Sequence, residues 1–188
     1  MLRPNPHWTP SLLRRARNIQ GLICDIDGVM TDGGIVYDSA GAETKRFHVR
    51  DGHAIKLAGR HGLKLAIITG RTSTVTARRA EELGFDYLEQ RALRKIEAFE
   101  RIVAESGIPA SSWAMIGDDV VDAPVMNRCG LAVAPGDAGL EIARHADWQT
   151  PSESGRGVVA DVIRLVLSAR GKWSEILAGY GIAPGARR

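Results

Sequence analysis

The sequence predicts an α/β fold, in which a parallel β-sheet carries helices on both of its faces. Short apolar runs alternate with amphipathic helical patterns along most of the chain, and several of these patterns end at glycine. Most of the apolar runs are followed at once by acidic, hydroxyl or basic residues, as in parallel sheets whose strand ends bind ligands. The length of 188 residues suits a single domain, 1–188, with a core of ordinary size.

The expected elements follow in order from the N-terminus. A short first helix opens at Thr9 and Pro10, a capping residue followed by a proline in the first turn. Buried strands are expected at 22–26, 65–69, 86–88, 113–117 and 131–134. Helices are expected at 72–83, 93–105 and 119–128 between these strands, and at 158–169 after them. This alternation predicts a Rossmann-like sheet with right-handed crossovers.

One segment breaks the alternation. Two strand-like runs, 35–38 and 44–49, are joined by a turn-like stretch and predict a β-hairpin inserted at about 34–49. The insert is too short to be a cap domain, and the next helix is expected to start near Asp51. Its apolar residues Ile35, Val36, Tyr37 and Phe47 are expected to be exposed in a single chain. The C-terminal tail, 172–188, is weakly patterned and expected to be mobile unless it docks.

Composition excludes several classes of function. The 25 basic and 22 acidic residues give a net charge of +3, and no basic run interleaved with aromatics indicates a nucleic-acid partner. Cys24 and Cys129 lack the spacing of a metal site and indicate buried thiols in a reducing compartment. No stretch has the ~20 apolar residues of a membrane span, and the N-terminus does not resemble a signal peptide. We therefore expect a cytoplasmic protein that acts on a small molecule.

The stretch GLICDIDGVMTDGG ends an apolar run in two acids, Asp25 and Asp27, separated by Ile26. A carboxylate can attack phosphorus if a second group protonates the departing oxygen and later activates water. We interpret Asp25 as this nucleophile, expected to stay ionised, and Asp27 as the acid/base, the better candidate to hold a proton. Ile26 then points into the core, and Gly28 lets the backbone turn under the phosphate. Acids at a strand end often only cap the next turn, so this pair needs support from other motifs.

That support comes from polar residues after the other strands. They are Thr69, Gly70 and Arg71 after the second strand, Lys95 after the third, and Asp118, Asp119 and Asp122 after the fourth. The carboxyl ends of parallel strands share one edge, so these groups should meet in one cleft. Three or more carboxylates together imply a cation, and an all-oxygen set favours magnesium over zinc. Thr69 and Lys95 would complement a phosphate bound to that metal. Taken alone, however, Lys95 is interpreted as a solvated helix lysine, because arginines lie near it in the sequence.

Four motifs, DIDGVMTDGG, FHVRDGHAIK, AIITGR and IGDDVVDAPVM, resemble the haloacid dehalogenase superfamily, and specifically its cap-less family of 3-deoxy-D-manno-octulosonate 8-phosphate phosphatases. The likeness covers residues 19–173. It implies a magnesium-dependent hydrolase of a sugar-acid phosphate, with an aspartyl-phosphate formed on Asp25 and protonation by Asp27. It also implies that Thr69 and Lys95 contact the phosphoryl group. The implied metal site contains Asp25, the backbone carbonyl of Asp27 and Asp118, with Asp119 and Asp122 nearby.

The resemblance further implies a homotetramer in which the hairpin packs against its copies and a neighbouring subunit closes each site. Gly70, Arg71 and Arg79 are then substrate-binding residues. Related enzymes that act on a nine-carbon sugar acid carry glutamate at the position of Arg71, which favours the eight-carbon substrate and leaves the nine-carbon one as the alternative. Two departures, Arg91 in place of a glycine and Ala160 in place of an arginine, bear on the substrate rather than on the phosphatase chemistry.

Two other classes of protein compete with this interpretation. A response-regulator receiver also combines a parallel sheet, an acidic cluster with magnesium, a phosphorylated aspartate, a threonine and a lysine. Its acid pair is adjacent after the first strand and its phosphorylated aspartate follows the third, whereas here the two acids of DID end the first strand and GDD follows the fourth. A catalytically silent assembly domain is the other alternative, and the complete set of motifs argues against it.

Overall fold

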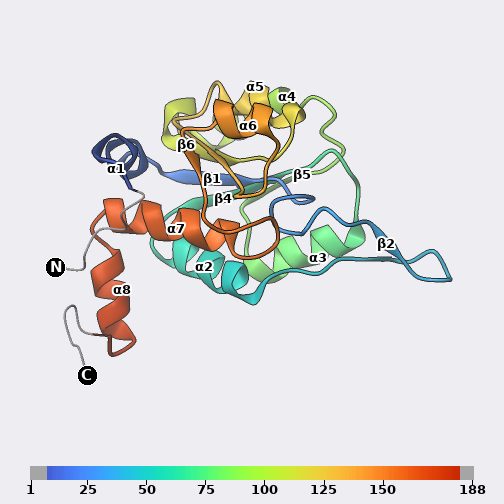
Figure 1. Cartoon of the computed structure of the whole chain (residues 1–188), viewed down its shortest axis with the longest axis horizontal. Coiled ribbons are helices and arrows are strands. Elements are labelled where there is room, and N and C mark those ends of the chain that lie inside the picture. The colour runs from blue at the N-terminus through green and yellow to red at the C-terminus, as the bar shows by residue number, and fades with distance from the viewer. Residues whose placement is uncertain (1–7, 183–188) are drawn as a thin grey trace.

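The computed structural model describes residues 8–182, and its centre is a six-stranded parallel sheet in the order β5-β4-β1-β6-β7-β8 (Figure 1). The strands are β1 (Gly21–Cys24), β4 (Lys64–Ile68), β5 (Tyr87–Glu89), β6 (Trp113–Ile116), β7 (Leu131–Ala134) and β8 (Trp148–Gln149). The α-helices are α1 (Pro10–Arg17), α2 (Val49–Arg60), α3 (Thr74–Leu83), α4 (Lys95–Ser106), α5 (Ala123–Met126), α6 (Leu140–His145), α7 (Val158–Ala169) and α8 (Trp173–Gly179). Two 3-10 turns, η1 (Ala110–Ser112) and η2 (Val120–Asp122), flank β6. The predicted α/β class and its parallel sheet are confirmed.

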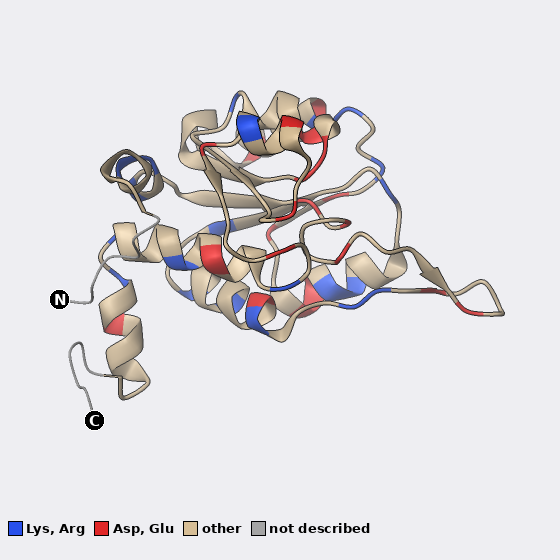
Figure 2. Ribbon diagram, in the orientation of Figure 1, with Lys and Arg blue, Asp and Glu red and all other residues tan. Residues whose placement is uncertain are grey.

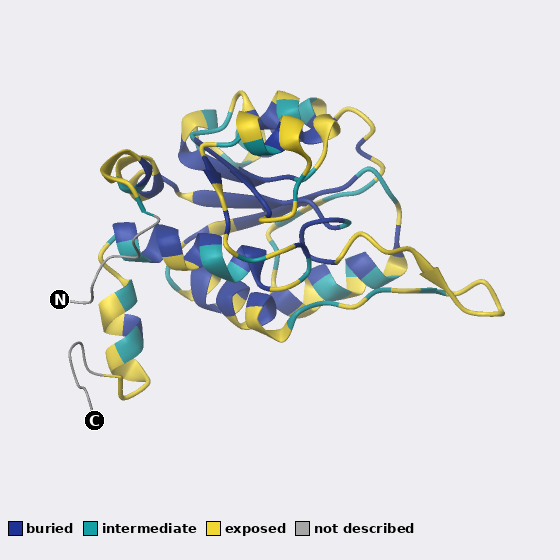
Figure 3. Cartoon of the chain, viewed as in Figure 1, coloured by how far each residue is buried: buried dark blue, intermediate teal, exposed yellow. Residues whose placement is uncertain are grey.

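The sheet separates two apolar cores, as the alternation of side chains along its strands requires. Leu22 and Cys24 of β1 point to the core formed with α1, α2, α3 and α7, while Ile23 points to the core formed with α4, α5 and α6. Figure 3 shows the resulting buried layers on both faces of the sheet. Cys24 lies fully in the first core, where burial raises the pKa of its thiol well above the ordinary value. It is therefore a packing residue, as expected.

The register of the three central strands places the candidate site. Cys24, the last residue of β1, pairs with Ile67 of β4 on one side and with Ile116 of β6 on the other. The three strands therefore end at nearly the same level, and the residues that follow them share one edge of the sheet. The chain order reverses at β1, which is where open parallel sheets bind their ligands.

The predicted hairpin is present but shorter than expected. Its strands β2 (Val36–Tyr37) and β3 (Glu43–Thr44) pair antiparallel, and Figure 1 shows them projecting away from the sheet. The second strand does not continue to residue 49, because the His48 side chain caps α2, which begins at Val49. Among the described residues, the hairpin is the only structure inserted between β1 and α2, and no cap domain is present.

The apolar residues of the hairpin are exposed at its tip and covered at its base. Ile35, Val36 and Tyr37 are each more than half exposed, as expected. Phe47 was expected to be exposed as well, but it packs partly against the core beside α2. The Arg79 guanidinium lies 5.5 Å from its ring centroid, a distance at which a cation and an aromatic ring attract each other. The base of the hairpin is thus held to the body of the molecule.

One further expectation needs correction, and two short elements were not predicted. The helix expected at 119–128 is instead the 3-10 turn η2 followed by the one-turn helix α5, since acidic side chains bind the local amide groups and Pro124 supplies none. The elements α6 and β8 were not predicted, because both are too short for a periodic pattern. The tail was expected to be mobile unless it docks, and its helix α8 does dock, since it packs on α7 through the buried Ile176. Residues 183–188 lie outside the described residues. Within residues 8–182, no helix has the length and apolar character needed to cross a membrane.

Candidate active site

A cleft of about 290 Å³ lies at the carboxyl ends of the central strands. Figure 2 shows acidic residues on the loops that follow these strands. Every predicted site residue except Arg79 and Asp122 lines the cleft, together with three apolar residues. The lining is Asp25, Asp27, Thr69, Gly70, Arg71, Ala92, Leu93, Lys95, Asp118, Asp119 and Val121.

Lys95 is the first residue of α4 and is buried rather than solvated, with its side chain only 3% exposed. Its Nζ lies 3.0 Å from Asp25 Oδ1 and 2.6 Å from Asp122 Oδ1. Burial works against the charge of Lys95, but the two carboxylates outweigh it and raise its pKa above the ordinary value. A fixed positive charge therefore lies directly beside the predicted nucleophile.

Asp122 supports the site from behind the cleft. It is completely buried, and while its Oδ1 accepts from Lys95, its Oδ2 accepts from the backbone amides of Asp118 and Asp119. Gly117 allows this packing, since a Cβ at that position would lie 2.4 Å from Asp122 Cβ. Both carboxylate oxygens are thus engaged with protein donors, which makes Asp122 a residue that orients Lys95 and the following loop.

Asp118 has the opposite environment, because its buried Oδ1 has no hydrogen-bond partner. Oxygens of Asp25, Asp118 and Asp122 lie within 4.8 Å of one another, close enough to surround one cation. In the absence of a metal ion, burial and the neighbouring acids raise the pKa of Asp118 to about 7. An unpartnered carboxylate oxygen in an all-oxygen cluster fits a hard divalent cation such as Mg²⁺.

The two acids of DID have different surroundings. Burial, offset in part by Lys95, raises the pKa of Asp25 to about 6, so this carboxyl ionises only near neutrality in the absence of a metal. Asp27, the acid/base predicted from the sequence, contacts two cations. Its Oδ1 forms an ion pair with Lys45, and its Oδ2 lies 3.6 Å from Arg71 Nε. Ile26, between the two acids, is fully buried as predicted.

The sequence interpretation missed Glu43 and Lys45 of the hairpin. Glu43 accepts from Arg71 Nη2 at 2.7 Å and from the Ser73 hydroxyl, and the Lys45 Nζ lies 3.6 Å from Glu43 Oε1. A signal was present in the sequence, since Glu43, Lys45 and Phe47 stand at every second position and so share one face of an extended segment. The same network explains the position of Arg71, whose Nη2 also donates to the Tyr37 hydroxyl at 3.3 Å.

Arg79 does not lie in the cleft of its own chain. It lines a separate cavity of about 400 Å³, which also contains Lys45, Phe47 and Arg78, and its Nη1 pairs with Glu82 at 2.9 Å. The prediction that Arg79 contacts substrate can therefore hold only for a site completed by another copy of the chain. The geometry within one chain does not bring Arg79 and Arg71 together.

The two departures from the family pattern have different structural settings. Arg91 has a φ of 55°, a left-handed backbone conformation that favours glycine, so a glycine there would relieve local strain. Ala160 lies in the first turn of α7, where its amide donates to Asp51 Oδ1 at 2.7 Å. Burial raises the pKa of Asp51, whose carboxyl was not singled out from the sequence and which here caps a neighbouring helix.

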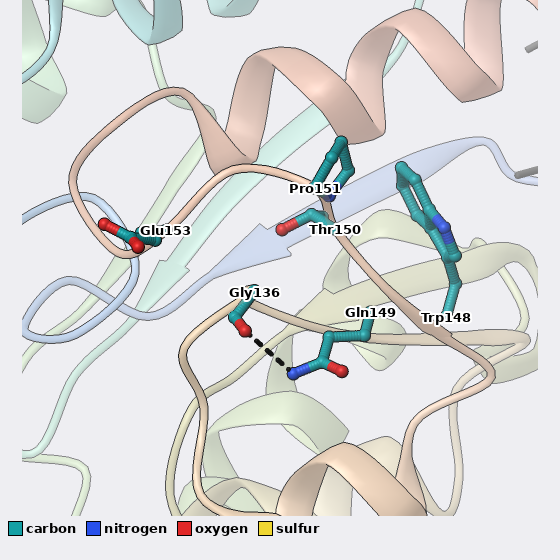
Figure 4. Close-up of a pocket in the computed structure, with 6 residues that line it drawn as sticks. All are labelled: Gly136, Trp148, Gln149, Thr150, Pro151 and Glu153. Carbon is teal, nitrogen blue, oxygen red and sulfur yellow. Dashed lines mark hydrogen bonds between the residues drawn. The ribbon is translucent and has the colours of Figure 1, made fainter.

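A third cavity, of about 380 Å³, lies between β8 and the loop before α7 (Figure 4). Gln149 spans its floor, and its Nε2 donates to the Gly136 carbonyl at 3.1 Å. Glu153 is the only ionisable side chain that lines this cavity in the part of the chain that is described. Because no second charged group converges on it, this cavity has fewer groups for acid–base or metal chemistry than the cleft at Asp25.

Comparison with known proteins agrees with this geometry. A family model for haloacid dehalogenase-like hydrolases matches residues 48–130. The 3-deoxy-D-manno-octulosonate 8-phosphate phosphatase of Salmonella typhimurium is 40% identical over 167 residues, which cover 89% of both chains.

Solved structures give the same result. A crystal structure of the corresponding phosphatase from Yersinia pestis superimposes with a TM-score of 0.86 at 40% identity, over 87% of this chain and 89% of that one. The enzyme from Moraxella catarrhalis, solved in complex with a magnesium ion, a phosphate ion and a KDO molecule, gives a TM-score of 0.89 at 32% identity, over 92% and 99% of the two chains. This chain therefore belongs to the haloacid dehalogenase-like hydrolases and, within them, to the family of 3-deoxy-D-manno-octulosonate 8-phosphate phosphatases.

Proposed function

We propose that this protein is a magnesium-dependent phosphomonoesterase that hydrolyses 3-deoxy-D-manno-octulosonate 8-phosphate to the free sugar acid and phosphate. The observation that carries the proposal is the buried group in which Lys95 bridges Asp25 and Asp122, with the unpartnered Asp118 oxygen beside it. Such a group provides a nucleophile, a fixed cation and room for a metal in one cleft. The 40% identity to phosphatases of this substrate supplies the substrate class.

The reaction runs through two displacements at phosphorus. In the first, a carboxylate oxygen of Asp25 forms a bond to phosphorus while the bond to the sugar oxygen breaks, and Asp27 gives its proton to that oxygen. In the second, Asp27 takes a proton from water, whose oxygen bonds to phosphorus and releases Asp25 with inorganic phosphate. Asp25 and Asp27 both line the cleft, as this division of roles requires.

Other residues of the cleft stabilise the transferred group. Lys95 is held by Asp122, so its ammonium group is oriented before substrate arrives and complements the charge on the phosphoryl oxygens. Thr69 is buried at the end of β4, with its hydroxyl 3.4 Å from the Arg71 amide, and provides a further hydrogen bond for those oxygens. Gly70 leaves the neighbouring space open, since a Cβ there would meet no atom within 4 Å.

The residues present fit a magnesium ion. Asp25, Asp118 and the backbone carbonyl of Asp27 would hold it, with Asp119 at the rim of the cleft and Asp122 orienting the loop. When bound, the ion would neutralise charge on the phosphoryl oxygens and would keep the Asp25 and Asp118 carboxylates ionised. The buried, unpartnered Asp118 oxygen is the feature of this chain that calls for such a cation.

Recognition of the sugar acid requires cations beyond the phosphate site. Arg71 lines the cleft and provides one, and its presence favours the eight-carbon acid over the nine-carbon alternative. The exposed hairpin residues Ile35, Val36 and Tyr37 support a homotetramer in which hairpins pack together and Arg79 reaches a neighbour's site.

The test is release of inorganic phosphate from a panel of sugar-acid phosphates, with and without magnesium. We expect the highest kcat/KM for the eight-carbon acid phosphate, no activity in excess chelator, and loss of turnover in Asp25→Asn. Asp86→Asn, which changes an acid outside the cleft, is the matched control and should remain active. A higher kcat/KM for the nine-carbon acid phosphate would show that the nine-carbon acid is the preferred substrate. Activity in excess chelator would contradict the metal site.

A further inference from the structure

The hairpin reaches the acid/base side of the cleft within its own chain. Lys45 follows β3, and its side chain is 2% exposed although the segment lies at the surface. Burial of a lysine is costly unless its charge is paired, and here the Nζ pairs with Asp27 Oδ1 and lies 3.6 Å from Glu43 Oε1. The contact crosses from the hairpin to the loop after β1.

Lys45 contacts Asp27 from outside the cleft. The described residues that line the cleft include Asp27 but not Lys45, which lines the neighbouring cavity with Arg78 and Arg79. Asp27 therefore has one oxygen held from behind by Lys45, while its other oxygen faces Arg71 at the cleft. A carboxylate held in this way cannot rotate freely about its last torsion.

Glu43 forms ion pairs with Lys45 and Arg71, the two cations that contact Asp27. Its carboxylate accepts from Arg71 and from the hydroxyl of Ser73, which also caps the start of α3. The negative charge of Glu43 balances Lys45 and Arg71, and Ser73 ties it to the body of the fold. The hydrogen bonds from Ser73 and Arg71 lower the pKa of Glu43, which keeps this anion charged.

We propose that Lys45 is a positioning residue for the acid/base Asp27, and that Glu43 holds Lys45 and Arg71 in the arrangement that this requires. The proposal rests on the phosphomonoesterase function proposed above. In the first displacement the bond from phosphorus to the sugar oxygen breaks and that oxygen takes the Asp27 proton. An alkoxide leaves poorly without this proton, whereas a nitrophenolate leaves well, so misplacing Asp27 should slow sugar phosphates selectively.

The experiment measures kcat and KM of Lys45→Met for a sugar phosphate that the wild-type enzyme turns over and for nitrophenyl phosphate. We expect kcat for the sugar phosphate to fall about 10- to 100-fold, as for a displaced catalytic group. For the aryl ester we expect single-turnover release of nitrophenol, which reports the first displacement alone, to slow less than about threefold, and we expect both KM values to change little. Steady-state kcat of either substrate also contains the second displacement, which needs Asp27 as the base. Lys45→Arg keeps the charge and should recover part of the loss. Lys64→Met, which removes another ion-paired lysine but one outside the cleft, should leave both rates unchanged.

Equal slowing of the first displacement for both substrates would overturn the proposal, because Lys45 would then only anchor the hairpin. An increase in KM alone would also overturn it and would make Lys45 a substrate contact. If Lys45→Met does not fold by circular dichroism, Glu43→Gln is measured instead, and absence of the same selectivity in that variant would contradict the proposal. A wild-type protein that hydrolyses no phosphomonoester would refute the proposed function first, and this inference with it.

Discussion

Asp118 occupies the space that a side chain on Gly28 would need. A Cβ on Gly28 would lie 2.0 Å from Asp118 Oδ2, and Gly28 has a φ of 95°, which L side chains rarely adopt. The glycine after the acid pair that follows β1 therefore permits the carboxylate after β6 to reach the centre of the cleft. Two motifs that are far apart in the sequence depend on each other through this contact.

The first prediction follows from that contact. Gly28→Ala should displace Asp118 and weaken magnesium binding by about 10- to 100-fold, as loss of a well-placed ligand does. The measurement is calorimetric titration with magnesium, beside phosphatase activity. Gly41→Ala is the matched control, because Gly41 also has a positive φ, of 81°, but a Cβ there would meet nothing within 4 Å. Equal loss of magnesium affinity in both variants would show that backbone strain, not the Asp118 contact, is responsible.

The second prediction concerns the buried charge of Lys95. Lys95→Met leaves Asp25 and Asp122 without their cation, so we expect the free energy of unfolding in chelator to fall by about 3 kcal/mol or more. Lys64→Met breaks an ion pair whose lysine side chain is 50% exposed and should cost less than about 1 kcal/mol. Denaturant unfolding of the two variants gives both values, and equal losses would mean that the Lys95 pairs contribute no more than a surface pair.

The third prediction links pH to stability in the absence of magnesium. The pKa of Asp118 is raised to about 7 and that of Asp25 to about 6, so both carboxyls bind protons more tightly in the folded state than in the unfolded chain. Their stabilising protonation is present at low pH and is lost as the pH rises from about 4 to about 7. Chelated protein should therefore be less stable at pH 7.5 than at pH 5.5. Asp118→Asn should flatten this slope, and a slope unchanged in Asp118→Asn would contradict the assignment.

Magnesium should reverse that trend, because only the ionised carboxylates bind the cation well. Added magnesium should raise the melting temperature more at pH 7.5 than at pH 5.5, by mass action on the folded state. A magnesium effect of the same size at both pH values would argue against a site built from Asp25 and Asp118.

The fourth prediction concerns the exposed hairpin tip. Replacing Ile35 and Val36 by serine removes apolar surface that copies of the chain would bury, so sedimentation should show smaller particles than the wild type. Arg79→Ala should leave the assembly intact but lower activity on the sugar-acid phosphate far more than on nitrophenyl phosphate. A wild-type monomer with full activity would contradict the tetramer, and equal losses on both substrates would contradict a recognition role for Arg79.

The sequence predicted the central strands and the residues that follow them, because buried strands and strand-end polar groups leave local signals. Asp25, Thr69 and Asp118 could be assigned to one cleft since parallel strands end at a common edge. Contacts between distant segments left weaker signals. From the sequence, Lys95 was interpreted as a solvated residue because Arg91 and Arg94 lie just before it. Its burial becomes visible only in the structure, where α4 packs against β4 and α5.

The role of the hairpin base could not be predicted from the sequence, for a similar reason. Lys45 reaches Asp27 across 18 positions of the chain, and nothing in the local pattern states which partner a half-exposed strand will meet. The short elements α6 and β8 fall below the length at which periodicity is informative. Their formation depends on packing against β7, which is a property of the assembled sheet.

Asp25 is expected to carry the phosphoryl group during turnover. Asp27→Asn should form the phosphoenzyme from an aryl phosphate and hydrolyse it slowly, because the base that activates water is missing. Acid quenching followed by mass spectrometry of the peptides should therefore find one phosphoryl group on Asp25 in this variant. Phosphate on any other residue, or steady release of phosphate with Asp25 unmodified, would contradict the account.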